Sequence, residues 1–446
     1  MIKVAKFGGS SLADAIQFEK VKKIVNSDDE RKFIVVSACG KANEEEHKVT
    51  DLLYLCAAHM QYGVSPDSLF SLVEEKYHKI VNDLNLKLNL DEEFNEIRSH
   101  FSKEIDTDYL VSRGEYLTAK ILAEYIDGEF IDAKDFISFI HNDEVDMDLS
   151  QKRFRELLKT DKKVVIPGFY GVLPNGNIKV MSRGGSDITG AIIANLIDAG
   201  IYENWTDVSG IYVADPRIIE NSLSCPRLTY RELRGMSYMG ANVLHDDAIF
   251  PVREKNIPIN IRNTNKPENK GTMIMADCKE LDEKDPPRII TGITGKQGYT
   301  IITLVKNHSS TLVGFLRDLL GIFEEYRVSI ESVPITVDTF SIIVQSKAIS
   351  NYLYEILGKI RERFEPDEIR VDENVALIAV VGRRMQSLPG ISGSLLSEFG
   401  RNSVNIKVIN QSADELSIVV GVENKDFEKA IHCIYDRFIL EEEETL

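Results

Sequence analysis

The segment VMSRGGSDITGAIIANLI, residues 180–197, decides how this chain is organised. It follows a β-rich run at residues 178–181 and opens a helical pattern, with Arg183 before two glycines and with Ser186 and Asp187 after them. Glycines let backbone amides approach an anion closely, and the N-terminus of a helix adds partial positive charge. The segment therefore predicts an anion site at a strand-to-helix turn. The alternative is a surface arginine and an aspartate that only caps the helix.

A second glycine turn lies near the start of the chain, in KVAKFGGSS at residues 3–11. Lys6 ends a predicted strand, and Gly8, Gly9 and Ser10 lead into a helix. This is not a Walker A loop, because that loop carries its lysine after the glycines. Alone, the turn is equally typical of an ordinary strand-to-helix connection. Two such turns, one with lysine and one with arginine, favour a site for two anions.

Two further segments contain candidate binding residues. YLVSRGEYLTAKIL, residues 109–122, places Glu115 near the start of an amphipathic helix, where it either favours the helix dipole or binds a substrate ammonium group. ENWTDVSGIYVADPR, residues 203–217, ends a strand and turns through Gly210. Open α/β sheets bind ligands at the carboxyl ends of their strands, so we predict a nucleotide site there. The alternative is an ordinary loop.

Up to about residue 290, short β-rich runs alternate with helical patterns, which predicts a layered α/β sheet. Between about residues 52 and 110 the pattern is mostly helical and charged, as expected of a helical insertion. Charges and the pair Pro286-Pro287 then mark a linker. The strands expected before the linker are residues 2–7, 33–37, 164–169, 178–181, 202–208 and 257–261.

After the linker, the same βαββ order occurs twice, about seventy-five residues apart. The first copy has a strand at 300–305, a helix at 315–326 and strands at 328–336 and 339–345. The second has a strand at 375–381, a helix at 391–400 and strands at 403–410 and 415–421. Each copy is too small to form a comfortable core alone, so we expect the two to pack side by side.

Composition excludes several classes of partner. The 446-residue chain has a formal net charge of −18 and no basic stripe, so nucleic acid and anionic membranes are excluded as partners. No apolar stretch is long enough to span a bilayer, and no leader peptide is expected. Five widely spaced cysteines without a CxxC pattern argue against a disulfide framework or a zinc site and favour the cytoplasm. Anionic substrates therefore need a local cluster of cations and amides.

Taken together, the motifs KFGGSS, SRGGSD, WTDVSGIYVADPR and GANVLH, followed by the paired repeat, resemble the aspartate kinases of the amino-acid kinase family. The resemblance covers essentially the whole chain and is greatest with a lysine-sensitive bacterial subgroup. It implies an α/β amino-acid kinase fold with an eight-stranded sheet between helices, followed by two ferredoxin-like βαββαβ ACT domains. The implied domains are residues 1–287 with the insertion at 52–110, then 299–371, and then 288–298 together with 372–446.

The resemblance also implies an activity. ATP and L-aspartate would give ADP and 4-phospho-L-aspartate, the first step of lysine, threonine and methionine biosynthesis. Feedback inhibition, by lysine in this subgroup, would act on a homodimer or tetramer joined through the ACT domains. Mg²⁺ would accompany ATP, with no protein side chain assigned as its ligand. Two alternatives stay open: a kinase acting on glutamate, against which SRGGSD and the repeat argue, and an inactive amino-acid sensor, against which Lys6, Arg183 and Asp187 argue.

Roles carried over from the family fall on matching positions. Lys6 and Asp187 would be catalytic, and Thr50, Glu115, Arg183 and Ser186 would bind aspartate. ATP would be bound by Gly8, Gly9, Ser10, Gly184, Gly185, Thr206, Asp207, Tyr212, Asp215 and Arg217. The effector would meet Gly314, Phe315, Leu316, Ser329, Ile330 and Glu331, unless these residues form core and Glu331 faces water. Asn242 departs from the family, because many relatives have a lysine there that contacts ATP.

Overall fold

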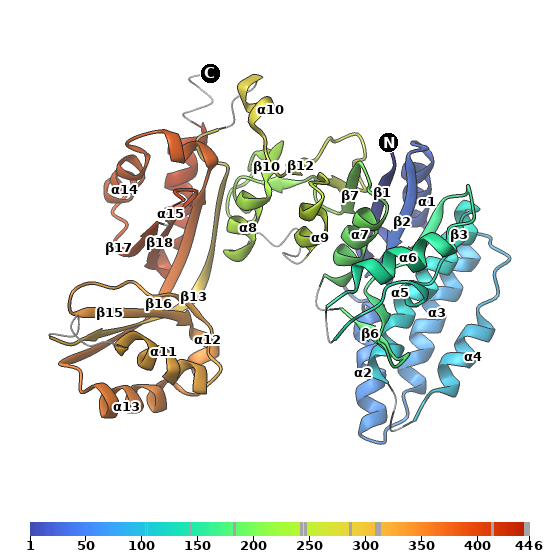
Figure 1. Cartoon of the computed structure of the whole chain (residues 1–446), viewed down its shortest axis with the longest axis horizontal. Helices are drawn as coiled ribbons and strands as arrows, with labels where there is room; N and C mark the ends of the chain where they lie inside the picture. The colour runs from blue at the N-terminus through green and yellow to red at the C-terminus, as the bar shows by residue number, and fades with distance from the viewer. Residues whose placement is uncertain are drawn as a thin grey trace. The chain divides into compact units, whose positions relative to one another are not determined.

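The structure is a computed structural model that describes the chain except residues 103, 105, 142–143, 182–183, 241–243, 245–247, 285–287, 308–313, 412–413 and 441–446. Two candidates from the sequence, Arg183 and Asn242, lie outside the described residues. The chain divides into two compact units (Figure 1). Unit 1 comprises Met1–Ile211, Ser224–Leu233 and Asn242–Lys279, and unit 2 comprises Tyr212–Leu223, Arg234–Ala241 and Glu280–Leu446.

Unit 1 is built on an eight-stranded sheet of order β10-β12-β11-β7-β1-β2-β4-β3, which confirms the expected sheet. Neighbouring strands are parallel except β11 and β12. The strands are β1 (Lys3–Phe7), β2 (Arg31–Val36), β3 (Glu129–Phe130), β4 (Val164–Pro167), β7 (Ile201–Thr206), β10 (Arg227–Thr229), β11 (Ile259–Asn263) and β12 (Thr272–Met275). The short strands β8 (Ile211–Tyr212) and β9 (Ser224–Cys225) lie outside this sheet.

The prediction that one of the expected strands belongs to this sheet is wrong. The run at residues 178–181 forms β6 (Ile178–Val180), which pairs antiparallel with β5 (Tyr170–Val172) in a separate two-stranded ribbon. The connection of residues 173–177 explains the difference. It is long enough for a hairpin but too short for the crossover that a parallel strand needs.

Helices cover both faces of the sheet (Figure 1). Helices α2 to α5 fill most of residues 49–126, a wider range than the helical segment expected at 52–110. Their apolar spacing explains them: α3 buries Phe70, Val73 and Tyr77 on one face. The helices of unit 1 are α1 (Ala15–Asn26), α2 (Val49–Gln61), α3 (Asp67–Asp83), α4 (Asp91–Ser99), α5 (Thr107–Ile126), α6 (Met147–Leu157), α7 (Gly185–Leu196), α8 (Tyr230–Tyr238, shared with unit 2) and α9 (Ile249–Glu254).

Strand alternation divides β1 between two environments. Phe7 belongs to the core that α1 to α5 complete, and its ring stacks on Trp205 of β7 at 6.0 Å. Lys6 points to the opposite face, where α7 packs against β1 and β7. The register pairs Lys6 with Asn204, so both side chains project from the same face at the carboxyl ends of their strands.

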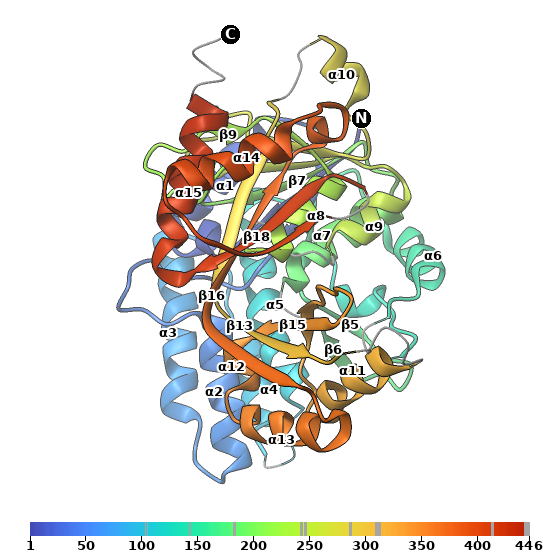
Figure 2. The same ribbon diagram turned by 90° about the vertical axis from the view of Figure 1, so that its left-hand side faces the viewer.

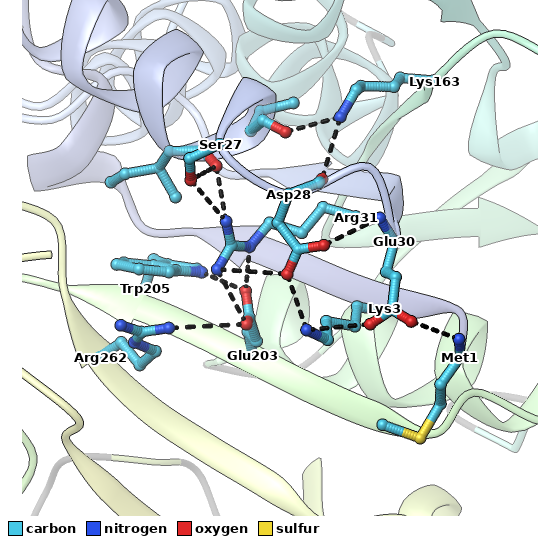
Figure 3. Close-up of polar contacts among 12 residues, drawn as sticks. Met1, Lys3, Ser27, Asp28, Glu30, Arg31, Lys163, Glu203, Trp205 and Arg262 are labelled. Atoms are coloured by element: carbon cyan, nitrogen blue, oxygen red, sulfur yellow. Dashed lines mark hydrogen bonds and ion pairs between the residues drawn. The ribbon is translucent and has the colours of Figure 1, made fainter. Parts of the chain in front are cut away.

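On the other face, a buried ion-pair cluster joins β2, β7 and β11 (Figure 3). Arg31 Nε donates to Glu203 Oε2 at 2.6 Å, and the indole of Trp205 donates to the same oxygen at 2.9 Å. A guanidinium nitrogen of Arg262 lies 3.8 Å from Glu203 Oε1. Glu203 is 2% exposed, so its charge is balanced almost entirely by these protein groups. The cluster fixes the strand that carries Asn204.

Unit 2 contains a six-stranded sheet of order β14-β15-β13-β16-β18-β17 in which every neighbouring pair is antiparallel (Figure 2). Its strands are β13 (Gly292–Val305), β14 (Ile330–Ser332), β15 (Thr339–Gln345), β16 (Glu368–Val381), β17 (Ile406–Gln411) and β18 (Ser417–Glu423). The helices are α10 (Lys279–Lys284), α11 (Phe315–Glu325), α12 (Ser346–Ile349), α13 (Leu353–Phe364), α14 (Ile391–Arg401) and α15 (Phe427–Tyr435).

The repeat predicted from the sequence packs side by side, as expected, through two long shared strands. In β13, residues 299–305 pair with β15, while residues 292–296 pair with the end of β16, which in turn pairs with β18. The strand expected at 328–336 is shorter, covering Ile330–Ser332. Among the residues that the structure describes, no helix is both long and apolar enough to cross a membrane.

The buried cluster predicts a test of stability. Glu203→Gln keeps the shape of the side chain but leaves the buried Arg31 charge with only Asp28, 3.9 Å away, as a counter-charge, so we expect a loss of about 3–5 kcal/mol in the free energy of unfolding. Urea unfolding measures this loss.

The control for this test is Glu30→Gln, since Glu30 forms its ion pairs at the surface and should change stability little. The double variant Arg31→Met/Glu203→Leu should recover most of the loss. A Glu203→Gln protein as stable as the Glu30→Gln protein would contradict the assigned role.

Candidate active site

An ion pair between Lys6 and Asp187 joins the two glycine turns. Lys6 Nζ lies 2.5 Å from Asp187 Oδ1, and both side chains are largely buried. Asn204 Nδ2 donates to the same oxygen at 2.9 Å, and the Tyr202 hydroxyl donates to the Asp187 carbonyl at 3.0 Å. The structure therefore brings together two predicted residues that are 181 positions apart (187 − 6) in the sequence.

The first glycine turn is tight and lies beside Lys6. A Cβ on Gly9 would lie 2.8 Å from the carbonyl oxygen of Ala38, so no larger residue fits without moving backbone. Gly40 donates its N–H to the Gly9 carbonyl at 2.9 Å. A Cβ on Gly8 would lie 3.7 Å from Lys6 Nζ, and Ser10 is exposed. The ammonium group thus lies at the edge of a backbone turn that is open at Ser10.

The second glycine turn places the start of α7. Gly184 adopts φ +80° as its N-cap, a conformation that favours glycine. A Cβ on Gly185 would lie 2.5 Å from the ring of Phe169, itself in the left-handed region at φ +80°. The first amides of a helix have no intrahelical acceptor, so the N–H groups of Gly185 and the buried Ser186 need acceptors from outside the helix, as an anion would provide.

Glu115 is a buried carboxyl group, only 4% exposed, and its Oε2 has no hydrogen-bond partner. It lies in the third turn of α5, because the helix begins at Thr107 with Asp106 as its N-cap. The expectation of a first-turn position, with its helix-dipole alternative, is therefore wrong. Burial raises the pKa of Glu115 to about 8, although the backbone N–H of Ala38 opposes this. A carboxyl group in this environment needs a proton or a cation, and an ammonium group supplies the charge.

One short loop connects Glu115 to the first glycine turn. The N–H of Ala38 donates a hydrogen bond to the Glu115 carboxyl group. The carbonyl oxygen of Ala38 packs against Gly9. The loop continues to α2, where Val49 donates its N–H to the Cys39 carbonyl at 3.3 Å. Thr50 is half-buried in the first turn of that helix. The candidate ammonium site and the candidate phosphate turn therefore share one structural support.

Thr206 and Asp207 follow directly at the carboxyl end of β7. The Thr206 hydroxyl donates to Asp207 Oδ1 at 3.2 Å, and Asn263 Nδ2 donates to the Asp207 carbonyl at 3.1 Å and to Ser209 Oγ at 2.9 Å. The loop is thus fixed by β11, while the Asp207 side chain stays exposed. The other predicted nucleotide residues, Tyr212, Asp215 and Arg217, belong to unit 2, where Arg217 Nη2 pairs with Asp215 Oδ2 at 2.6 Å.

The predicted effector residues lie around the start of α11 and along β14 in unit 2. Gly314 caps α11 at φ +86°, and Leu316 and Ile330 are half-buried while Ser329 is exposed. Phe315 packs its ring against Phe340 at 4.6 Å, so its side chain belongs to the core.

Glu331, the charged member of this set, is half-buried and already has partners. It accepts a hydrogen bond from Gln345 Nε2 at 3.1 Å. The Tyr238 hydroxyl also bonds to Glu331, and burial, followed by this bond, raises the pKa of that hydroxyl. Glu331 is therefore held by two neighbouring side chains while part of it stays exposed to water.

Sequence reasoning missed Asn204, Asn263 and the loop at Ala38–Gly40. A signal existed for Asn204, because Glu203 and Asn204 are polar residues within a predicted strand, and buried polar residues mark functional or structural sites. The loop carries no such signal, since its role depends on contacts with segments distant in sequence. Among the described residues, no group of three or more His, Cys, Asp or Glu side chains is arranged to hold a metal ion.

Comparisons with known proteins agree with this geometry. The amino acid kinase family model matches residues 1–263, and an ACT domain model matches residues 378–438. The chain is 35% identical to aspartokinase 3 of Bacillus subtilis (strain 168), with 98% of each protein covered. A crystal structure of Clostridium acetobutylicum aspartate kinase matches with 43% identity and a TM-score of 0.89, covering 98% of this chain and 99% of that one.

E. coli aspartokinase III shares the fold at 22% identity. Its complex with aspartate and ADP (R-state) matches with a TM-score of 0.77, and its complex with lysine and aspartate (T-state) with 0.78. Each match covers 98% of this chain and 99% of the other.

The environment of Glu115 predicts a pH-dependent difference in stability. The unfolded chain ionises this carboxyl group near its ordinary pKa of 4.5, whereas the folded chain does so near about 8. Ionisation therefore weakens folding as the pH rises between these values. We therefore compare the free energy of unfolding of the ligand-free protein with that of Glu115→Gln at pH 5 and at pH 8. The unaltered protein should lose stability relative to the variant as the pH rises. The loss should be about 1.4 kcal/mol for each unit by which folding raises the pKa of Glu115.

Urea unfolding of both proteins at the two pH values measures this difference. Glu124→Gln, at an exposed glutamate of the same helix, is the matched control and should give a difference independent of pH. The assignment fails if Glu115→Gln behaves in the same way as that control.

Proposed function

We infer the function from the premise that this chain belongs to the amino acid kinase family and is one of its aspartate kinases. The enzyme transfers the γ-phosphate of ATP to the side-chain carboxylate of L-aspartate. The observation that carries the assignment is the contact of Lys6 with Asp187, which brings two cation-bearing glycine turns to one point. Such a point is where two anionic reactants can meet in a protein whose net charge of −18 otherwise repels them.

Phosphoryl transfer to a carboxylate needs stabilisation of negative charge rather than a general base. An aspartate side chain is ionised at neutral pH, because its ordinary pKa is near ~4, so the attacking oxygen has no proton to lose. The barrier is the repulsion between this carboxylate and the phosphate. Lys6 offers a positive charge at the glycine turn, and Asp187 holds that ammonium group in place. Lys6 thereby stabilises the charge of the transferred phosphoryl group.

The acceptor would be held by groups on the other side of the turn. Glu115, buried and with an unpartnered oxygen, would bind the ammonium group of aspartate, which supplies the missing counter-charge. Arg183, outside the described residues, would pair with a carboxylate of the substrate. Thr50 and Ser186 would add hydrogen bonds. Ionisation of the Glu115 carboxyl group would then be favourable at neutral pH only while the ammonium group of aspartate is bound beside it.

ATP would bind across the carboxyl ends of β1 and β7. Its phosphates would meet Gly8, Gly9, Ser10, Gly184 and Gly185, and its nucleoside would meet Thr206, Asp207, Tyr212, Asp215 and Arg217. Mg²⁺ would arrive on the phosphates and neutralise part of their charge, in keeping with its preference for phosphate and water over protein cages. Asn242 offers no cation, so the affinity for ATP depends on the remaining groups.

We assign feedback regulation to unit 2. The proposed division is a catalytic domain at 1–287, one ACT domain at 299–371, and a second at 288–298 with 372–446. Lysine, which E. coli aspartokinase III binds in its T-state, would bind near Gly314, Leu316, Ser329, Ile330 and Glu331. Regulation of this kind requires an interface with two states, so the enzyme would work as a homodimer or tetramer, in the cytoplasm.

The reaction is tested by aspartate-dependent ADP release. For Lys6→Ala we expect kcat to fall by about 100-fold or more, while the KM for aspartate changes less than about threefold, because Lys6 acts on the charge of the transition state. Lys3→Ala is the matched control, since Lys3 lies on the same strand but pairs with Asp28 away from the turn. Equal activity with glutamate as acceptor, or a loss confined to KM, would contradict the proposal.

Regulation is tested by lysine titration of the same activity. Glu331→Gln removes the charge expected to meet the effector's ammonium group, so half-inhibition should need about tenfold more lysine. Glu355→Gln, at an exposed glutamate of α13, should leave the inhibition curve unchanged. An unaltered curve for Glu331→Gln would remove Glu331 from the effector site.

A further inference from the structure

Asn204 makes a contact that no role assigned so far explains. Its Nδ2 donates to Asp187 Oδ1 at 2.9 Å, and that oxygen also receives Lys6 Nζ at 2.5 Å. A carboxylate only accepts hydrogen bonds, so the NH₂ group of the amide must face Asp187. This orientation leaves Asn204 Oδ1 without a partner in a side chain that is 2% exposed.

Packing alone does not account for an asparagine at this position. Its register partner on β11 is Ile261, and the preceding residue on the same face of β7 is Tyr202, whose ring packs beside Gly190 of α7. A buried amide oxygen without a partner costs free energy, which an apolar side chain of the same size would avoid. The unpartnered oxygen therefore lowers the stability of the strand. Such sites are often functional.

The geometry points to Asn204 as a positioning residue for phosphoryl transfer: its amide holds Asp187 so that Lys6 reaches the glycine turn. Because Oδ1 takes part in both the ion pair with Lys6 and the hydrogen bond from Asn204, Asp187 would hold the ammonium group without turning its carboxylate fully onto Lys6. Lys6 Nζ then stays beside Gly8 with its other N–H groups available to a phosphate. Without the amide, Asp187 is free to rotate and draw the ammonium group toward α7.

The opposite face of β7 makes this control possible. Glu203 and Trp205 lie on either side of Asn204 along the strand, and both take part in the buried cluster with Arg31 and Arg262 (Figure 3). The strand is thereby fixed from the other side of the sheet. Asn204 acts from a rigid backbone, which is what a group needs in order to set the direction of a neighbouring charge.

The inference rests on the proposed function and is tested with the full-length enzyme. Asn204→Leu keeps the approximate size and removes both polar atoms. We expect kcat to fall about tenfold with the KM values for aspartate and ATP within about twofold, because a misdirected Lys6 weakens the transition state more than the bound substrates. The midpoint of thermal unfolding should change little, because removal of the unpartnered oxygen offsets the loss of the hydrogen bond to Asp187.

Asn260→Leu is the matched control. Asn260 is 8% exposed and its Oδ1 is also unpartnered, but its register partner is Glu203, so it lies on the other face of the sheet. This variant should not lower kcat. Asn204→Ser is the second test variant, because its hydroxyl is too short for the contact with Asp187 and should give the same loss of kcat if Asn204→Leu does not fold.

The outcomes separate the two claims. If the unaltered enzyme releases no ADP in response to aspartate, the proposed function is wrong. If it is active and folded Asn204 variants retain full kcat, as Asn260→Leu should, or if kcat and both KM values change together, Asn204 has no positioning role.

Discussion

The ion pair between Lys6 and Asp187 is the constraint on which the rest of unit 1 depends. A lysine that is 7% exposed at the end of a central strand is tolerated only beside a counter-charge, and Asp187 supplies it from the first turn of α7. The pair ties the sheet to that helix at the point where both glycine turns open. The enzyme thus holds a positive charge ready in a place where water does not screen it well, and this is the condition under which a single cation helps most in phosphoryl transfer.

Strand β7 serves two purposes because its side chains alternate between faces. Glu203 and Trp205 join the buried cluster that fixes β2, β7 and β11, whereas Tyr202 and Asn204 turn toward α7 and contact Asp187. Polar residues in the middle of a buried parallel strand are costly, and here Glu203 contacts the charge of Arg31 on β2 while Asn204 contacts the charge of Asp187 on α7. Neighbouring residues of one strand therefore contribute to the buried cluster and, in the proposed mechanism, to catalysis.

At Glu115, by contrast, a buried carboxyl group has no ion-pair partner among the described residues. Glu115 has a raised pKa and one unpartnered oxygen, so ionisation of this carboxyl group costs free energy in the ligand-free enzyme. The binding of an aspartate ammonium group would relieve this cost, which links substrate affinity to an unfavourable feature of the empty site. The loop at Ala38–Gly40 connects Glu115 to the first glycine turn, so the two proposed halves of the site would share the same backbone.

The sequence by itself determined the fold class, the repeat in unit 2 and the family, because glycine turns, apolar periodicity and turn residues are local patterns. It also identified Lys6, Asp187 and Glu115 as candidate site residues, because they are charged residues beside glycine turns or near the predicted start of a helix. Only the tertiary structure decided that Lys6 meets Asp187, that Glu115 lies in the third turn of its helix, that residues 178–180 form a hairpin, and that Asn204 lies beside the ion pair. These facts depend on which segments become neighbours in space and on how strands are registered, and no local pattern of side chains encodes that.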